Sequence, residues 1–273
     1  MMADTMQLRP RTPGRAGAPR GGRFKGAVAS EWTKLWSLRS TWLTLVAAVA
    51  MQAVYVFFTS ASIASQNESG RADAMQSSAP ESAVDAVFVS QLAVITLAVL
   101  VIASEYATGS IRSTLQWVPV RSRMLLAKCA VVGPVLLVTG VVMGAVGVAV
   151  ADVVLGEYGT EYGTGNAVRA IVGIGLVMAL CGMLTIGLGA VLRSVAATMA
   201  VAFVLLLIVP MILQMSKVPA LEKAVDYLPS MAGQRFMLGD SEHYPDWMGL
   251  GILAVWTAAL LTAGYLVLRE RDA

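Results

Sequence analysis

The sequence EYATGSIRSTLQWVP at residues 105–119 separates two long apolar runs, VDAVFVSQLAVITLAVLVIA at 84–103 and KCAVVGPVLLVTGVVMGAVGVAV at 128–150. A helix rises about 1.5 Å per residue, so each run is long enough to cross about 30 Å of hydrocarbon. Among the segments that separate apolar runs in this chain, this one has the most regular pattern of polar residues. We therefore predict two membrane spans whose connection, residues 105–119, is the element around which the rest of the chain is arranged.

The composition supports a membrane protein. Of the 273 residues, 57% are hydrophobic and 14% are charged, and the mean hydropathy is +0.70. Soluble domains average about 25% charged residues. A soluble core could not hide so much apolar surface, so we predict an all-α integral membrane protein with six transmembrane helices. The predicted spans are 41–60, 84–103, 128–150, 167–192, 195–215 and 247–268.

The boundary between the fourth and fifth spans is short. Only Arg193 and Ser194 separate two runs that are each long enough to cross the bilayer. One very long helix is the alternative, but two crossings joined by a tight turn fit the thickness of a membrane better.

The distribution of Lys and Arg predicts the orientation, because cytoplasmic loops carry an excess of basic residues. With the N-terminus inside, 15 of the 20 basic residues fall in cytoplasmic segments. The five on the external side are Arg71, Arg169, Lys217, Lys223 and Arg235. We therefore expect a multi-pass protein of the cytoplasmic membrane with both termini in the cytoplasm. The basic pI near 9.0 is explained by this topology, so no nucleic-acid partner is expected.

The N-terminal region changes character at residue 23. Residues 1–22 are rich in Pro, Gly and Arg, and we predict a disordered basic tail preceding a permease domain at 23–273. Residues 23–42 place Phe24, Val28, Trp32, Leu35 and Trp42 on one helical stripe. Tryptophan favours the membrane interface, so we predict an interfacial amphipathic helix in contact with membrane lipids; a cytosolic extension of the first span is the alternative. Its candidate functional residues are Trp32, Lys34, Leu35 and Arg39.

Two further polar segments have helical patterns. Before the last span, residues 216–246 are too polar to cross the membrane and too apolar for a plain linker, which predicts a pair of short external helices. In the connection at 105–119, Gly109 weakens the helix that leaves the second span, and Pro119 ends the next one. A short cytoplasmic helix between them, with an apolar ridge, is suited to a groove on a soluble partner. An ordinary loop helix lying at the membrane interface is the alternative for this segment taken alone. Its candidate docking residues are Glu105, Gly109, Ile111, Arg112, Leu115 and Val118.

The sequence carries no pattern for catalysis. It lacks G-x-x-x-x-G-K-[ST], G-x-S-x-G and H-E-x-x-H, so we expect no catalytic, cofactor-binding or metal site and no enzyme activity in this chain. Cys129 and Cys181 lie in apolar runs without C-x-x-C spacing, and His243 is the single histidine. The span interiors carry few ionisable residues, which disfavours an ion-coupled carrier.

Three segments resemble ABC transporter permeases of the type-2 exporter superfamily from actinobacteria. SEWTKLWSLRSTW at 30–42 resembles their entry helix, EYATGSIRSTL at 105–115 is similar to the segment after their second span, and YLPSMAG at 227–233 is similar to the element before their last span. Ser110 departs conservatively from the commoner threonine. With the six-span order, the resemblance covers residue 23 to the end.

The resemblance implies a half-transporter that pairs with a second permease copy or a paralogue. Separate ATPase subunits would bind ATP and Mg, with residues 105–119 as the coupling helix and 23–40 as the connecting helix. Glu105 would lie at a hinge, and the second and fifth spans would line the substrate route. The expected function is export of a small molecule (a drug, as in multidrug resistance, a lipid or a secondary metabolite). A non-transporting anchor or immunity-type protein that recruits a soluble partner is the alternative.

Overall fold

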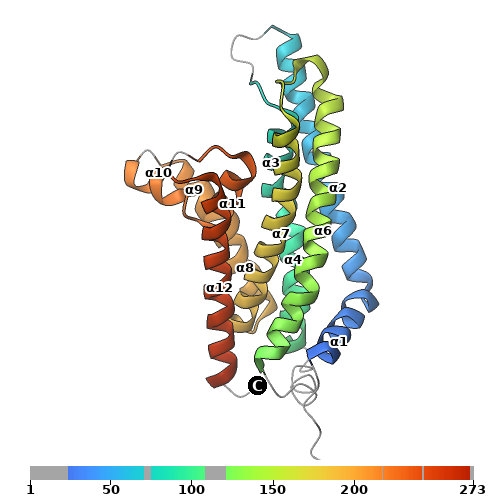
Figure 1. Cartoon of the computed structure of the whole chain (residues 1–273), viewed down its shortest axis with the longest axis vertical. Helices are drawn as coiled ribbons and strands as arrows, with labels where there is room; N and C mark the ends of the chain where they lie inside the picture. The colour runs from blue at the N-terminus through green and yellow to red at the C-terminus, as the bar shows by residue number, and fades with distance from the viewer. Residues whose placement is uncertain (1–23, 71–74, 108–120, 217, 242, 271–273) are drawn as a thin grey trace, which may run out of the picture.

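The computed structural model describes residues 24–70, 75–107, 121–216, 218–241 and 243–270, and the regular structure within them is entirely helical. The long helices run side by side in an elongated bundle (Figure 1). In chain order the elements are α1 Phe24–Ser37, α2 Arg39–Glu68, α3 Ala79–Asp85, α4 Val87–Ala107, α6 Arg121–Leu155, η1 Gly156–Tyr158, α7 Thr164–Leu192, α8 Val195–Phe203, η2 Val204–Ile208, α9 Val209–Gln214, α10 Pro219–Val225, α11 Pro229–Leu238 and α12 Asp246–Glu270.

The predicted all-α membrane architecture is confirmed. Five helical segments are long and apolar enough to cross a membrane, namely α2, α6, α7, the continuous stretch from α8 to α9, and α12. The pair α3–α4 makes a sixth when it is counted as one bent span. The chain is therefore a multi-pass membrane protein.

The second span differs from the prediction, because it is broken at Ala86 by a bend of 44° between α3 and α4. The first piece begins at a capping box in which Ser78 and Glu81 bond each other's backbone N–H groups. Gln52 of α2, which is fully buried, holds the bend: its amide nitrogen donates to the Ala83 carbonyl at 2.7 Å, and its oxygen accepts from the Ser90 hydroxyl at 2.7 Å. A tertiary contact therefore spans the bend, and no proline or glycine lies within two residues of Ala86.

Helix α7 lies at the centre of the bundle and packs against α3, α4, α6, α8, α11 and α12. Small residues permit its closest approaches. A Cβ atom on Gly140 of α6 would lie 2.7 Å from the Cα of Gly175, and one on Gly187 would lie 2.7 Å from the backbone of α12. Membrane helices associate largely through such close packing, since lipid removes the hydrophobic drive between them.

The expected tight turn after α7 is confirmed. Arg193 adopts a left-handed backbone conformation (φ 55°) that ends α7, and the Ser194 hydroxyl caps α8 by accepting from the Ala197 N–H. The following span contains a π-helical segment, η2, directly before Pro210. The fifth span is therefore continuous from Val195 to Gln214 but irregular near its middle.

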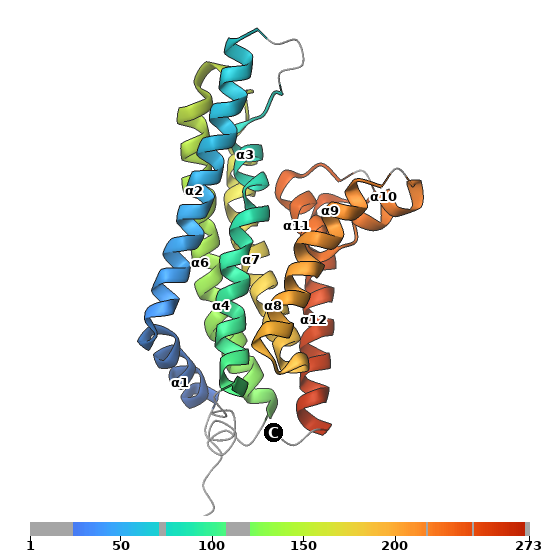
Figure 2. The ribbon, with the colours of Figure 1, turned by 180° about the vertical axis from the view of Figure 1, so that it is seen from behind.

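The two short helices predicted before the last span are present as α10 and α11. Figure 2 shows α9 and α10 projecting to the side of the bundle, while α11 returns to pack on α7 and α12. At the other end of the molecule lie α1, the last turn of α4, the first turn of α6 and the C-terminal end of α12 (Figure 1). We call this the terminal end and the α10–α11 side the opposite end.

Candidate functional site

A fully buried lysine lies at the terminal end. Lys128, near the start of α6, has no exposed surface. Its ammonium group donates to Glu31 Oε2 at 2.8 Å, to Glu105 Oε1 at 2.8 Å and to the Val101 carbonyl at 3.1 Å. Burying an ammonium group without partners is very costly, so these three acceptors are what make the position tolerable.

Glu31 brings α1 into the same cluster. Its side chain is buried, and Oε1 accepts from Lys34 one turn later at 2.8 Å. Burial alone would raise the pKa of Glu31, but the neighbouring Lys128 and Lys34 hold it below its ordinary value. Burial likewise opposes the charge of Lys34, and the carboxylates of Glu31 and Glu105 outweigh it and raise the Lys34 pKa. Both groups are therefore held in their charged forms.

Glu105 is the residue that α4 contributes to the cluster. Its Oε1 accepts from both Lys128 and Lys34, the latter at 3.0 Å. Its Oε2 is shielded from solvent and has no hydrogen-bond partner among the described residues. Glu31, Lys34, Glu105 and Lys128, which we call the four-charge cluster, thus join α1, α4 and α6 with two positive and two negative groups.

Local sequence explains how α1 reaches this cluster. Its buried residues are Ala27, Glu31 and Leu35, spaced four apart along one helical face. That face packs on α6, so Glu31 points inward between two small or apolar neighbours. The tryptophans predicted to share a stripe with Leu35 lie elsewhere: Trp32 and Trp42 are exposed.

The structure separates the sequence-predicted residues into three groups. Glu105, Lys34 and Leu35 are at or beside the cluster, whereas Trp32 and Arg39 lie on the exposed surface. The predicted docking residues Gly109, Ile111, Arg112, Leu115 and Val118 lie outside the described residues. They belong to the connection between the last turn of α4, which carries Glu105, and the start of α6.

Sequence reasoning missed Glu31 and Lys128 as site residues. Two signals were present: Glu31 and Lys34 are spaced for an ion pair on one helix, and Lys128 interrupts the run LLAKCAVV. Neither signal identifies the partner, because Glu31 and Lys128 are 97 positions apart.

A second cluster lies at the opposite end, between α10 and α12. Buried Asp226 accepts from Arg235 Nε at 3.0 Å and bonds His243 Nδ1 at 2.7 Å, and its carbonyl accepts from the Tyr244 hydroxyl at 2.8 Å. Arg235 also bonds Asp240 at 3.1 Å. Burial alone would lower the pKa of Arg235, but the Asp226 and Asp240 carboxylates raise it. We call these five residues the Asp226 cluster.

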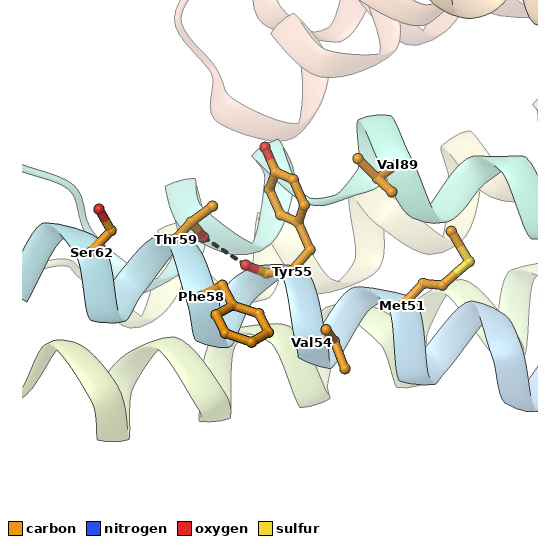
Figure 3. Close-up of a pocket in the computed structure, with 7 residues that line it drawn as sticks. All are labelled: Met51, Val54, Tyr55, Phe58, Thr59, Ser62 and Val89. Atoms are coloured by element: carbon orange, nitrogen blue, oxygen red, sulfur yellow. Dashed lines mark hydrogen bonds between the residues drawn. The ribbon is translucent and has the colours of Figure 1, made fainter.

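An apolar groove opens along the outside of α2 (Figure 3), with a volume of about 400 Å³. Within it the Thr59 hydroxyl donates to the Tyr55 carbonyl of the same helix at 2.9 Å. The lining residues are Met51, Val54, Tyr55, Phe58, Thr59, Ser62 and Val89.

The described residues contain no group of three or more His, Cys, Asp or Glu side chains that could hold a metal ion. Both cysteines are buried in the bundle as free thiols.

These features define a multi-pass α-helical membrane protein whose terminal end is organised by buried charges. Residues 28–273 match the family described as ABC-2 family transporter protein. The chain belongs to this family, and so it is the membrane subunit of an ABC transporter, a non-catalytic permease whose partner is an ABC ATPase subunit. A search of curated proteins gave no match to this chain.

Proposed function

We propose that this chain is the permease of an ABC exporter that moves a small molecule out of the cell. Two permease subunits, identical or paralogous, would pair in the cytoplasmic membrane with both termini inside. ATP and Mg would be bound by the separate ATPase subunits, because the chain has no phosphate-binding loop of its own. Drugs, lipids and secondary metabolites are the candidate substrates.

The observation that carries the proposal is the four-charge cluster at the terminal end. It ties α1 to α4 and α6, the two helices between which residues 108–120 run. A partner that pushes on this connection would act on three helices held together by charges that are costly to separate. The cluster thus supports a role for Glu105 as the residue through which a displacement of residues 108–120 would be transmitted to α4.

The bend in the second span offers a route from that point to the opposite end. Glu105 lies in the last turn of α4, and the bend at Ala86 lies at its start. Beyond the bend, Asp85 of α3 accepts from Gln234 of α11 at 3.2 Å. A tilt of α4 would therefore displace α11. We propose that the Asp85–Gln234 contact helps to open the external side of the permease.

Co-purification with the ATPase tests the docking part of the proposal. The ATPase encoded beside this chain is expected to remain bound in detergent, and Ile111→Asp or Leu115→Asp should reduce the bound amount at least tenfold. The matched control is Val153→Asp, which places the same charge on an exposed apolar site near the C-terminal end of α6, away from the terminal end, and should leave binding unchanged. Undiminished binding in both docking variants would refute the assignment.

ATPase stimulation separates an exporter from an anchor. A transporter complex should hydrolyse ATP faster in the presence of a transported compound, so a panel of amphipathic compounds is added to the purified complex. Stable ATPase binding without stimulation by any compound, and without ATP-dependent uptake into inverted vesicles, would favour the non-transporting anchor. Uptake that persists without ATP and collapses with an uncoupler would instead indicate an ion-coupled carrier.

A further inference from the structure

The junction of α1 and α2 carries an exposed surface that combines aromatic and basic side chains. The two helices are separated at Leu38, whose backbone is extended, so α1 turns away from the axis of α2 (Figure 2). The exposed residues that make up this elbow surface are Lys25, Trp32, Leu38, Arg39, Trp42 and Leu43.

The charge of the elbow surface is basic because of the four-charge cluster. Glu31 is the one acidic residue between positions 24 and 45, and it is buried against Lys128. Lys34 shares its ammonium with Glu31 and Glu105. Lys25 and Arg39 are exposed and have no ion-pair partner among the described residues. Helix α1 is about 20 Å long, so they bracket a surface of that size.

The aromatic part of the surface is continuous. The rings of Trp32 and Trp36 have centroids 5.5 Å apart, and those of Trp36 and Trp42 are 4.7 Å apart. The Trp36 indole nitrogen is shielded from solvent and has no acceptor among the described residues. Indole rings favour the depth of lipid headgroups, where an apolar ring and an N–H donor are both satisfied.

We propose that the elbow surface binds anionic phospholipids, with Lys25 and Arg39 pairing with headgroup phosphates and the tryptophans and leucines lying among the upper acyl chains. A free phosphate ion would use the basic groups but not the exposed Trp32, Leu38, Trp42 and Leu43, so the surface fits a lipid. Placing this surface at the inner leaflet rests on the proposed function. The lipid preference itself does not depend on it.

Quenching by brominated lipids tests the proposal on the full chain in vesicles of phosphatidylcholine and phosphatidylglycerol. Phenylalanine replaces Trp117, Trp247 and Trp256, so that the measured fluorescence comes only from the tryptophans of the elbow. At equal mole fractions, brominated phosphatidylglycerol should quench more strongly than brominated phosphatidylcholine. Each exposed basic residue contributes up to about fivefold to local enrichment of anionic lipid. The double variant K25Q/R39Q should remove most of the excess quenching by brominated phosphatidylglycerol. The control variant K223Q, which changes an exposed lysine on α10, should leave that excess unchanged.

The position control keeps Trp247 alone, an exposed tryptophan at the other end of the molecule beside Asp246, and should show no excess. Raising salt should reduce the excess at the elbow without any substitution, which keeps the test independent of variant folding. Equal quenching by the two lipids, or an excess that survives K25Q/R39Q, would overturn the proposal. ATPase co-purification is measured in detergent without phosphatidylglycerol, so it is independent of the quenching test. A negative result in one test therefore does not contradict the proposal that the other test addresses.

Discussion

The two charge clusters of this protein are built from similar groups but in different ways. The four-charge cluster joins α1, α4 and α6 across 71 and 97 positions of sequence. Lys128 at its centre is completely buried, and Lys34 at its edge is 43% exposed. The Asp226 cluster joins residues 9 and 17 positions apart, and the side chains of Arg235, Asp240 and His243 remain 31%, 46% and 30% exposed.

We propose that the Asp226 cluster has a local structural role, whereas the four-charge cluster couples the movements of distant helices. A local, partly solvated cluster holds the short helices α10 and α11 in place, and its loss affects that region. We propose that the four-charge cluster, which links distant helices, makes their ends move together, since separating its members would leave uncompensated charge in an apolar setting.

Lys128→Met is expected to have the largest effect. It leaves Glu31 and Glu105 buried with only Lys34 between them, and removing one partner of a buried pair costs about 3–5 kcal/mol. Chemical or thermal unfolding in detergent measures the loss. A cost below about 1 kcal/mol would mean that the cluster is hydrated and does not bind the three helices together.

Removing the charges together sharpens the same prediction. The triple variant K128M/E31Q/E105Q eliminates the uncompensated carboxylates, so it should recover much of the stability lost in K128M. We predict that ATPase stimulation is not recovered, because the link between α1 and α4 is still missing. Full recovery of both properties would show that the cluster contributes only to stability.

Asp226→Asn is expected to have an intermediate and local effect. The amide keeps the volume but loses charge-assisted bonds to Arg235 and His243, at a cost of about 2 kcal/mol. Hydrogen exchange should accelerate roughly 30-fold in α11 and the following loop while the terminal end stays protected. Faster exchange at α1 or α6 would contradict the separation of the two clusters.

Acidification is expected to have a smaller effect through Glu31. Its pKa is depressed in the folded state relative to the ordinary value of 4.5, so its contribution is fully present above pH 4.5 and is lost as the pH falls through the folded-state pKa. Stability measured from pH 6 downward should therefore decline less steeply in Glu31→Gln than in the unmodified chain. Parallel curves would show that Glu31 does not contribute in this way.

Arg169→Met provides the smallest effect and a matched control for Lys128→Met. Arg169 pairs with Asp246 at 3.0 Å, but both side chains are more than 40% exposed. Such surface pairs contribute about 0–1 kcal/mol. A loss as large as that of Lys128→Met would show that burial is not what distinguishes the four-charge cluster.

The sequence predicts most of the fold because hydropathy and helix length are local properties. The turn at Arg193–Ser194 was predictable, since two polar residues between two spanning runs leave room for nothing longer. The bend at Ala86 was not, because it depends on Gln52, which is 31 positions from the Ala83 carbonyl that it binds.

The candidate site was predictable only in part for the same reason. The sequence indicates Glu105 because it follows the second apolar run, and Lys34 because it is a basic residue of the amphipathic stretch 23–42. Their contact with each other and with Lys128 follows from how α1 packs on α6, which no local pattern encodes. The docking role of residues 109–118 stays a prediction.

The most direct test of the account is a pair of distances measured by spin labels in the purified transporter complex. Labels at Thr33 of α1 and Leu126 of α6 report within the terminal-end unit, and labels at Leu126 and Leu266 of α12 report across the bundle. The native cysteines are replaced by alanine. On trapping with ATP and vanadate, we expect the 126–266 distance to change and the 33–126 distance to stay constant, and we expect the 33–126 distance to change as well in Lys128→Met. A 33–126 distance that changes on trapping in the unmodified chain, or no ATP-dependent change in either distance, would contradict it.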